Sequence, residues 1–251
     1  MSEEKIYSFP KSMKDVRTHY SAGCGHGIVH KLIAQIMDEL GIQEKTLVVA
    51  PVGCSVLAYN YLNADGLEAA HGRAPAVSTG LKRVHKDKVV ICYQGDGDLL
   101  AIGTAETVHA ANRGEHISVI FINNAIYGMT GGQMAPTTME GQVTKTTPYG
   151  RNPKEVGWPI RACELLNTLE APYYIERCAV YDVKHINQTK KAIKKAIQNQ
   201  IDGKGYSFVE ILSMCPTNWG VDPTKAAEWV RDVMEPYYPV KCFRDGGEKT
   251  K

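Results

Sequence analysis

The chain has 251 residues, of which 43% are hydrophobic, and a formal net charge of +2. This composition provides one sizeable core and excludes a disordered chain, a collagen-like repeat and a small disulfide scaffold. The 29 basic and 27 acidic residues nearly cancel, so no global basic field favours a nucleic-acid partner. No apolar run approaches the ~20 residues of a membrane span, and the N-terminus lacks a signal peptide. We therefore expect a cytoplasmic protein with no membrane partner.

Helical periodicities and short apolar runs alternate along the chain. In chain order they predict a helix at residues 27–40, a strand at 46–52, a loop and then a helix within 66–82, a strand at 88–93, a helix at 101–112, a strand at 118–122, a helix at 180–199 and a strand at 207–213. Nearly all-apolar strands interleaved with helices indicate a three-layer α/β fold with a mostly parallel sheet. The ligand site is expected at the carboxyl ends of the strands.

Three segments fall outside this alternation. Residues 1–17 and 245–251 are polar and are expected to be loose ends. Residues 135–159 have few hydrophobic positions, which is typical of a functional or partner-contacting loop, although an ordinary surface loop is the alternative. We expect residues 1–251 to form a single domain with a C-terminal extension.

The strongest chemical signal lies where the second and third predicted strands end. Gly95-Asp96-Gly97-Asp98 follows one strand and Asn123-Asn124 follows the next, with 25 residues between Gly97 and Asn123. Glycines allow the backbone to approach a diphosphate, and the following helix directs its N–H groups toward that anion. A carboxylate, an amide oxygen and the Ile126 carbonyl suit Mg²⁺. Two unrelated tight turns are the alternative interpretation.

This pattern resembles the thiamine diphosphate motif, in which GDG precedes NN by one helix and one strand. Other segments extend the resemblance to the β subunit of 2-oxoacid:ferredoxin oxidoreductases, over about residues 20–219. They are Gly23-Cys24-Gly25-His26-Gly27, Val52-Gly53-Cys54-Ser55, Ala70-His71-Gly72-Arg73 and Tyr127-Gly128-Met129-Thr130-Gly131-Gly132-Gln133.

The resemblance implies the thiamine diphosphate-binding fold and a subunit that oxidatively decarboxylates a 2-oxoacid to acyl-CoA with reduction of ferredoxin. A branched-chain 2-oxoacid is favoured and 2-oxoglutarate comes next. The implied partners are an α subunit, which supplies the glutamate that activates the cofactor, and γ and δ subunits. Two other functions stay open: a non-redox thiamine diphosphate-dependent 2-oxoacid decarboxylase subunit, and a non-catalytic assembly subunit.

The resemblance also assigns roles to residues. Asp96, Asn124 and the Ile126 carbonyl are expected to hold Mg²⁺, and Met129 and Thr130 to lie near the thiazolium. The residues expected around the cofactor are Gly53, Cys54, Ser55, Gly95, Asp96, Gly97, Asp98, Asn124, Ile126 and Gly128. His71 and Arg73 are expected to contact the diphosphate or the substrate carboxylate, with bonding to local carbonyls as the alternative.

The seven cysteines are an odd number in a chain expected in a reducing compartment, which argues against a disulfide framework. By the resemblance, Cys24, Cys54 and Cys215 match three ligand positions of a [4Fe–4S] cluster, and Ser21 stands at the fourth. Three interpretations stay open. The cluster is held by three thiolates with Ser21 or water, it is absent, or Ser21 is a variant or engineered position in a cluster protein.

Overall fold

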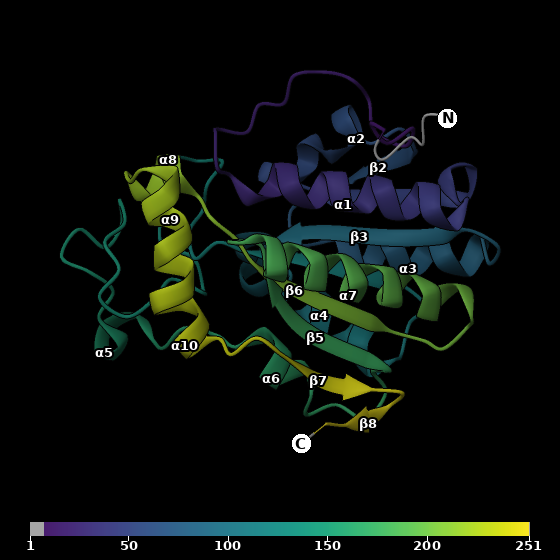
Figure 1. Ribbon diagram of the computed structural model, residues 1–251. Helices are drawn as coiled ribbons and strands as arrows, with labels where there is room; N and C mark the ends of the chain where they lie inside the picture. The colour runs from purple at the N-terminus through teal and green to yellow at the C-terminus, as the bar shows by residue number, and fades with distance from the viewer. Residues whose placement is uncertain (1–7, 251) are drawn as a thin grey trace.

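The computed structural model describes residues 8–250. Its centre is an eight-stranded sheet in the order β2-β1-β3-β4-β6-β5-β7-β8 (Figure 1). The strands are β1 (Thr46–Pro51), β2 (Asp65–Ala69), β3 (Val89–Gly95), β4 (Ser118–Asn123), β5 (Tyr174–Ala179), β6 (Ser207–Leu212), β7 (Lys241–Asp245) and β8 (Glu248–Lys249). The pairings from β2 to β5 are parallel, and β7 and β8 add antiparallel pairings at the edge. This confirms the mostly parallel sheet.

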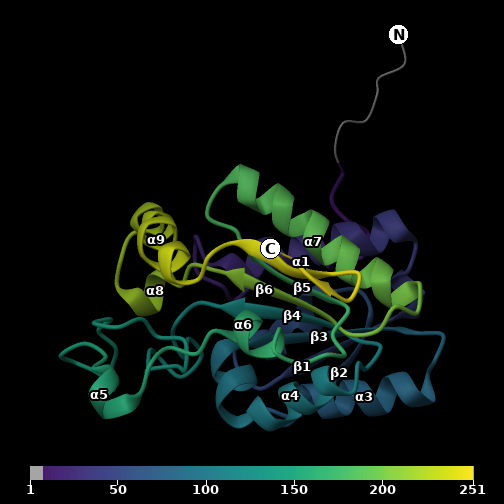
Figure 2. The ribbon, with the colours of Figure 1, turned by 90° about the horizontal axis from the view of Figure 1, so that it is seen from below.

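Helices cover both faces of the sheet. The α-helices are α1 (Gly25–Leu40), α2 (Ala58–Tyr61), α3 (Ala74–Val84), α4 (Thr104–Asn112), α5 (Pro153–Val156), α6 (Ala162–Leu166), α7 (Val183–Ile201), α8 (Pro216–Trp219), α9 (Pro223–Trp229) and α10 (Glu235–Tyr237). Short 3₁₀ turns form at Gln43–Lys45 and Cys54–Leu57, and π-helical turns at Asp98–Ile102 and Val230–Met234. Figure 2 shows α1 and α7 on one face and α3 and α4 on the other, which is the expected three-layer arrangement. Within the described residues, no helix combines the length and the apolarity of a membrane span.

Each face of the sheet has its own core. The residues on the α1 and α7 face include Ile33, Met37, Ile120 and Ile197, all fully buried. The other core includes Val119, Phe121 and Phe208, with Phe121 and Phe208 rings 5.7 Å apart. Alternate residues of β4 therefore point into opposite cores, as expected for a strand covered on both faces.

Several strands lacked an apolar run in the sequence. Strand β2 reads DGLEA and lies at an edge, where only Ala69 is buried. Strand β5 carries Arg177, which is fully buried because Glu164 and Glu210 pair with it at 2.5 and 2.8 Å. A charged residue inside a sheet is tolerated when it is paired in this way, and the hydrophobic pattern cannot anticipate such pairing.

Parts of both expected loose ends are ordered against the domain, so those predictions were wrong for the described residues. The backbone N–H and the hydroxyl of buried Ser12 both donate to Asp38, and the Lys14 amide donates to the Tyr61 carbonyl. At the other end, strands β7 and β8 occupy 241–245 and 248–249. Residues 1–7 and 251 lie outside the described residues.

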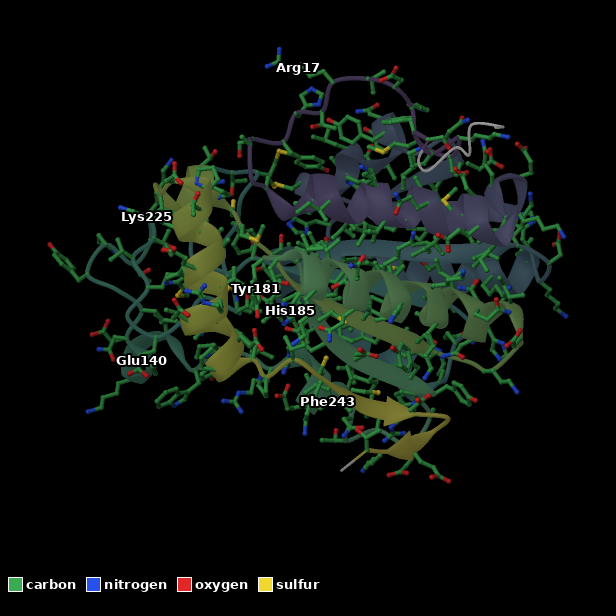
Figure 3. All side chains as sticks on the ribbon, viewed as in Figure 1. Arg17, Glu140, Tyr181, His185, Lys225 and Phe243 are labelled. Carbon is green, nitrogen blue, oxygen red and sulfur yellow. The ribbon has the colours of Figure 1, made fainter. Side chains whose placement is uncertain are left out.

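The carboxyl ends of the parallel strands face a group of connecting segments. Figure 1 shows α8, α9 and the long connection after β4 gathered at this end of the sheet. Figure 3 labels Glu140 of that connection and Lys225 of α9 on the same side of the molecule. Within residues 135–159 this connection contains only the short helix α5, which agrees with the loop predicted there.

Candidate functional site

A cavity of about 100 Å³ opens at the carboxyl ends of the central strands. Loops after β1, β2, β3 and β4 and the first turn of α1 form its walls. Its lining includes all the residues predicted around the cofactor, together with His71, Met129 and Thr130. The parallel sheet brings them together because its neighbouring strands end at one edge.

The side-chain oxygens of Asp96 and Asn124 share one backbone N–H donor. The Ile126 amide lies 3.3 Å from the Asp96 carboxylate and 3.3 Å from the Asn124 side-chain oxygen. Asp96 also accepts hydrogen bonds from the Gly97 amide at 2.8 Å and the Thr137 hydroxyl at 2.7 Å. Two oxygen atoms able to bind a metal, from the ends of neighbouring strands, therefore lie close together, as the GDG and NN spacing predicts.

Asp96 is buried without a cationic side chain among its described hydrogen-bond partners. Burial raises the pKa of the Asp96 carboxyl to about 6, although the hydrogen bonds from Thr137 and backbone amides oppose that rise. A divalent cation would supply the missing positive charge, and carboxylate, amide and carbonyl oxygens are the ligands that Mg²⁺ prefers. The donor set at Asp96, Asn124 and Ile126 therefore fits Mg²⁺.

The turn between Asn124 and Ile126 is held in an uncommon conformation. Ala125 has a φ of +57°, in the left-handed region that non-glycine residues rarely adopt. The Asn123 side-chain oxygen accepts the Ala125 amide at 3.3 Å, and the Ala125 carbonyl accepts the Thr138 hydroxyl at 2.7 Å. The long connection after β4 thus holds Asp96 through Thr137 and the turn at Ala125 through Thr138. Their sequence positions did not reveal this role.

Glycines leave room beside these oxygens. A Cβ added at Gly53 or Gly95 would meet no protein atom within 4 Å, so both positions border open space. At Gly97, a Cβ would lie 2.1 Å from the Tyr127 ring. Gly97 is therefore required for close packing, whereas Gly53 and Gly95 border space that a diphosphate could fill.

The two aspartates of the motif act differently. The Asp98 carboxylate accepts hydrogen bonds from His71 Nδ1 at 2.6 Å, the Gly72 amide at 2.5 Å and Gln94 Nε2 at 2.6 Å. Burial raises the pKa of Asp98 while these three donors and the charge of His71 lower it. Asp98 therefore orients His71 at the cavity wall rather than offering a free carboxylate to a ligand.

Arg73 is not brought to the cavity. Its guanidinium pairs with Glu106 at 2.6 Å and donates to the Ile102 carbonyl at 3.4 Å. Arg73 thus shows the local bonding given as the alternative, with Glu106 on α4 as its carboxylate partner, and its contact with diphosphate or substrate stays a prediction.

The three cysteines of the predicted cluster gather beside the cavity. A Cβ at Gly128 would lie 3.2 Å from the Cys54 sulfur and 3.6 Å from the Cys215 sulfur. Burial raises the pKa of Cys24 to about 11 and that of Cys54 to about 12, and the neighbouring cysteines add to both shifts. Among the described residues, however, no group of three or more histidine, cysteine or acidic side chains has the arrangement of a metal site. The cluster therefore stays a prediction.

His26 also lines the cavity. The sequence placed it in the Gly23-to-Gly27 motif without assigning it a role.

A larger cavity of about 820 Å³ lies at the opposite end of the sheet, where Lys45, Lys88 and Val89 border it. That end carries none of the convergent motif residues, and ligands of open α/β sheets bind at the carboxyl ends of the strands. The smaller cavity is therefore the functional candidate.

Comparison with known proteins identifies the family of this chain. Residues 51–211 match the family of the thiamine pyrophosphate enzymes, C-terminal TPP binding domain. The ketoisovalerate oxidoreductase subunit VorA of Methanothermobacter thermautotrophicus is 53% identical over 99% of this chain and 54% of its own length. The 2-oxoglutarate synthase subunit KorB of Methanocaldococcus jannaschii is 39% identical over 80% of this chain and 70% of its own length.

A solved structure has the same fold. The 2-oxoglutarate:ferredoxin oxidoreductase from Magnetococcus marinus, solved with 2-oxoglutarate, coenzyme A and succinyl-CoA bound, superposes with a TM-score of 0.75. The match covers 99% of this chain and 88% of that one at 24% identity. The chain spans about half the length of VorA. By the matched domain and by its identity to KorB over most of that subunit, the chain belongs to the family of thiamine pyrophosphate-binding subunits of 2-oxoacid:ferredoxin oxidoreductases.

Proposed function

We propose that this chain is the thiamine diphosphate- and Mg²⁺-binding subunit of an enzyme that oxidatively decarboxylates a 2-oxoacid to acyl-CoA and reduces ferredoxin. The observation that carries the proposal is the buried Asp96 and Asn124 pair, joined through the Ile126 amide in the cavity lining. A branched-chain 2-oxoacid is the favoured substrate, because identity is 53% to the ketoisovalerate subunit and 39% to the 2-oxoglutarate subunit.

Different residues would bind different parts of the cofactor. Thiamine diphosphate supplies the carbon nucleophile that adds to the 2-oxo group. Asp96, Asn124 and the Ile126 carbonyl would hold the Mg²⁺ that neutralises its diphosphate, with Gly53 and Gly95 giving the backbone access to it. Met129 and Thr130 border the outer part of the cavity, and Met129 is 47% exposed, so its side chain is available to a substrate or to a partner chain.

The cavity is too small to complete the reaction alone. Ligand pockets typically measure about 300–1,000 Å³, whereas this one measures about 100 Å³. This volume is below that of pockets that enclose a ligand the size of a whole cofactor. We infer that an α subunit covers the opening and supplies the group that activates the cofactor, and that γ and δ subunits belong to the same complex.

The test is a steady-state comparison in the assembled complex, with coenzyme A and ferredoxin present. We expect kcat/KM for 2-oxoisovalerate to exceed that for 2-oxoglutarate, and acyl-CoA to form in step with reduced ferredoxin. A preference for 2-oxoglutarate above about tenfold, which corresponds to about 1.4 kcal/mol, would overturn the choice of substrate. An Asp96→Ala complex is the inactive control.

A second function is favoured by Ser21, which stands where the resemblance places a fourth cluster cysteine. Without a complete cluster, the chain would belong to a non-redox thiamine diphosphate-dependent 2-oxoacid decarboxylase. Aldehyde release without coenzyme A or an electron acceptor would support this alternative. About four irons and acid-labile sulfides per chain, in protein purified without oxygen, would exclude it.

A further inference from the structure

The cavity lining offers a diphosphate no permanently charged side-chain cation. None of its described lining residues is lysine or arginine. Oxygens of a bound diphosphate must therefore be matched by a metal and by hydrogen-bond donors, N–H groups among them, which form strong hydrogen bonds to anions. The lining side chains that carry N–H groups are His26, His71 and Asn124.

Two of these three side chains have other contacts within the site. The Asn124 side-chain oxygen accepts the Ile126 amide at 3.3 Å. His71 is hydrogen-bonded through Nδ1 to the Asp98 carboxylate at 2.6 Å. His26 is the third of these side chains.

His26 is held rigidly in the first turn of α1. It is 1% exposed, and its ring stacks on Tyr20 with centroids 5.0 Å apart and an interplanar angle of 11°. Its Nδ1 lies 2.6 Å from the Tyr93 hydroxyl. Because one face and one nitrogen are covered, Nε2 is the ring nitrogen left for the cavity that His26 lines.

Tyr93 is the partner of the other ring nitrogen of His26. Its hydroxyl lies 2.6 Å from His26 Nδ1. When the phenol donates to Nδ1, a neutral imidazole carries its ring proton on Nε2. Nε2 is then a hydrogen-bond donor at the cavity.

We propose that His26 donates its Nε2–H to an oxygen of the bound diphosphate, and that Tyr93 is the positioning residue that fixes this donor tautomer. The identity of the ligand as thiamine diphosphate rests on the proposed function. The donor role requires only a diphosphate with Mg²⁺, so the two claims can be tested separately.

His30 provides a matched control. It lies one turn further along α1, is fully buried, and stacks on the same Tyr20 at 5.4 Å. Its Nε2 is paired with the Tyr20 hydroxyl at 3.0 Å, and it is not part of the cavity lining. His30→Leu therefore disturbs the same aromatic cluster as His26→Leu without removing a donor from the cavity.

The experiment is calorimetric titration of the full chain, assembled with its partner, with two probes. One probe is inorganic diphosphate with Mg²⁺ and the other is thiamine diphosphate with Mg²⁺. We expect His26→Leu to weaken both by about tenfold or more, the cost of a hydrogen bond to a charged group. His26→Gln keeps a side-chain N–H donor and should bind within about threefold of the unsubstituted chain, whereas His30→Leu should leave both affinities unchanged.

Tyr93→Phe tests the positioning role. We expect an intermediate loss of affinity together with a change in the ¹⁵N shifts of the His26 ring, from the pattern of an Nε2–H tautomer to a mixture. An unchanged tautomer in Tyr93→Phe would contradict that role.

The results separate the two claims. The donor role of His26 is overturned if His26→Leu binds inorganic diphosphate normally, if His26→Gln is as weak as His26→Leu, or if His30→Leu loses as much. Binding of inorganic diphosphate without thiamine diphosphate would contradict the proposed function alone, and His26 would still be tested by the first probe. Binding of neither probe would contradict both.

Discussion

Asn123, at the end of β4, donates its side-chain amide to the Glu210 carboxylate of neighbouring β6 at 2.7 Å, and both side chains are fully buried. The other oxygen of Glu210 accepts Arg177 Nε at 2.8 Å. Asn123 uses its own side-chain oxygen to accept the Ala125 amide. A buried ion pair in the sheet is thereby connected to the left-handed turn that presents Asn124 and Ile126.

Glu210→Gln should therefore affect both stability and the site. It leaves buried Arg177 with Glu164 as its remaining carboxylate partner, and breaking a buried pair costs about 3–5 kcal/mol. We expect a loss of unfolding free energy of that order and weaker binding of thiamine diphosphate with Mg²⁺, measured by denaturant unfolding and calorimetry.

Glu39→Gln is the control for that variant, because Glu39 pairs with Lys190 and Lys194 at the surface. Surface pairs contribute about 0–1 kcal/mol, so both measurements should stay close to those of the unsubstituted chain. If Glu210→Gln has the same unfolding free energy and cofactor affinity as Glu39→Gln, the link between the sheet and the turn at Ala125 is wrong.

The raised pKa of Asp96 predicts a pH dependence of stability. Because burial raises it to about 6, the folded metal-free chain retains a proton that the unfolded chain has already lost. Stability should fall as pH rises from about 4 to about 6, and Asp96→Asn should remove that fall. Unfolding of both proteins across this range, with and without Mg²⁺, is the measurement. The same slope in both would show that another group is responsible.

Gly97→Ala should disrupt the site by steric contact. Its new Cβ would lie 2.1 Å from the Tyr127 ring, which belongs to the cavity wall. We expect lower stability and loss of cofactor binding. Gly80→Ala in α3 is the matched substitution, since a Cβ there meets nothing within 4 Å, and it should stabilise the chain by about 0.5–1 kcal/mol. Equal behaviour of the two variants would contradict the packing role of Gly97.

Thr137→Val should raise the pKa of Asp96 further. The substitution preserves shape but removes the hydroxyl that donates to the Asp96 carboxylate at 2.7 Å, and that hydrogen bond lowers the pKa. The pH midpoint of the stability change should move upward and Mg²⁺ binding should weaken near neutral pH. Thr168→Val, at an exposed hydroxyl that donates to the Leu165 carbonyl, should change neither.

The sequence predicted the convergence of Asp96 and Asn124 because both follow apolar strands and one helix separates those strands. It also predicted the cavity residues around Gly53 and His71, through their motifs. These features depend on local pattern and on the geometry of parallel sheets, which a single chain displays directly.

The missed features depend on contacts between distant residues. Thr137 reaches Asp96 across 41 positions and His26 reaches Tyr93 across 67, and neither separation leaves a periodic signal. The sequence pattern did not predict strand β5, because the burial of Arg177 depends on its pairing with Glu164 and Glu210. The spacing also did not reveal that Glu106 pairs with Arg73.

The most direct test of the central claim is thiamine diphosphate binding to the assembled complex, measured by calorimetry with and without Mg²⁺, for the unsubstituted chain and for Asp96→Ala. Because Asp96 and Asn124 converge in the cavity lining, we predict about one cofactor bound per chain in the presence of Mg²⁺. Binding should be greatly weakened without the metal or in Asp96→Ala. Cofactor binding that is indifferent both to Mg²⁺ and to Asp96→Ala would contradict the account.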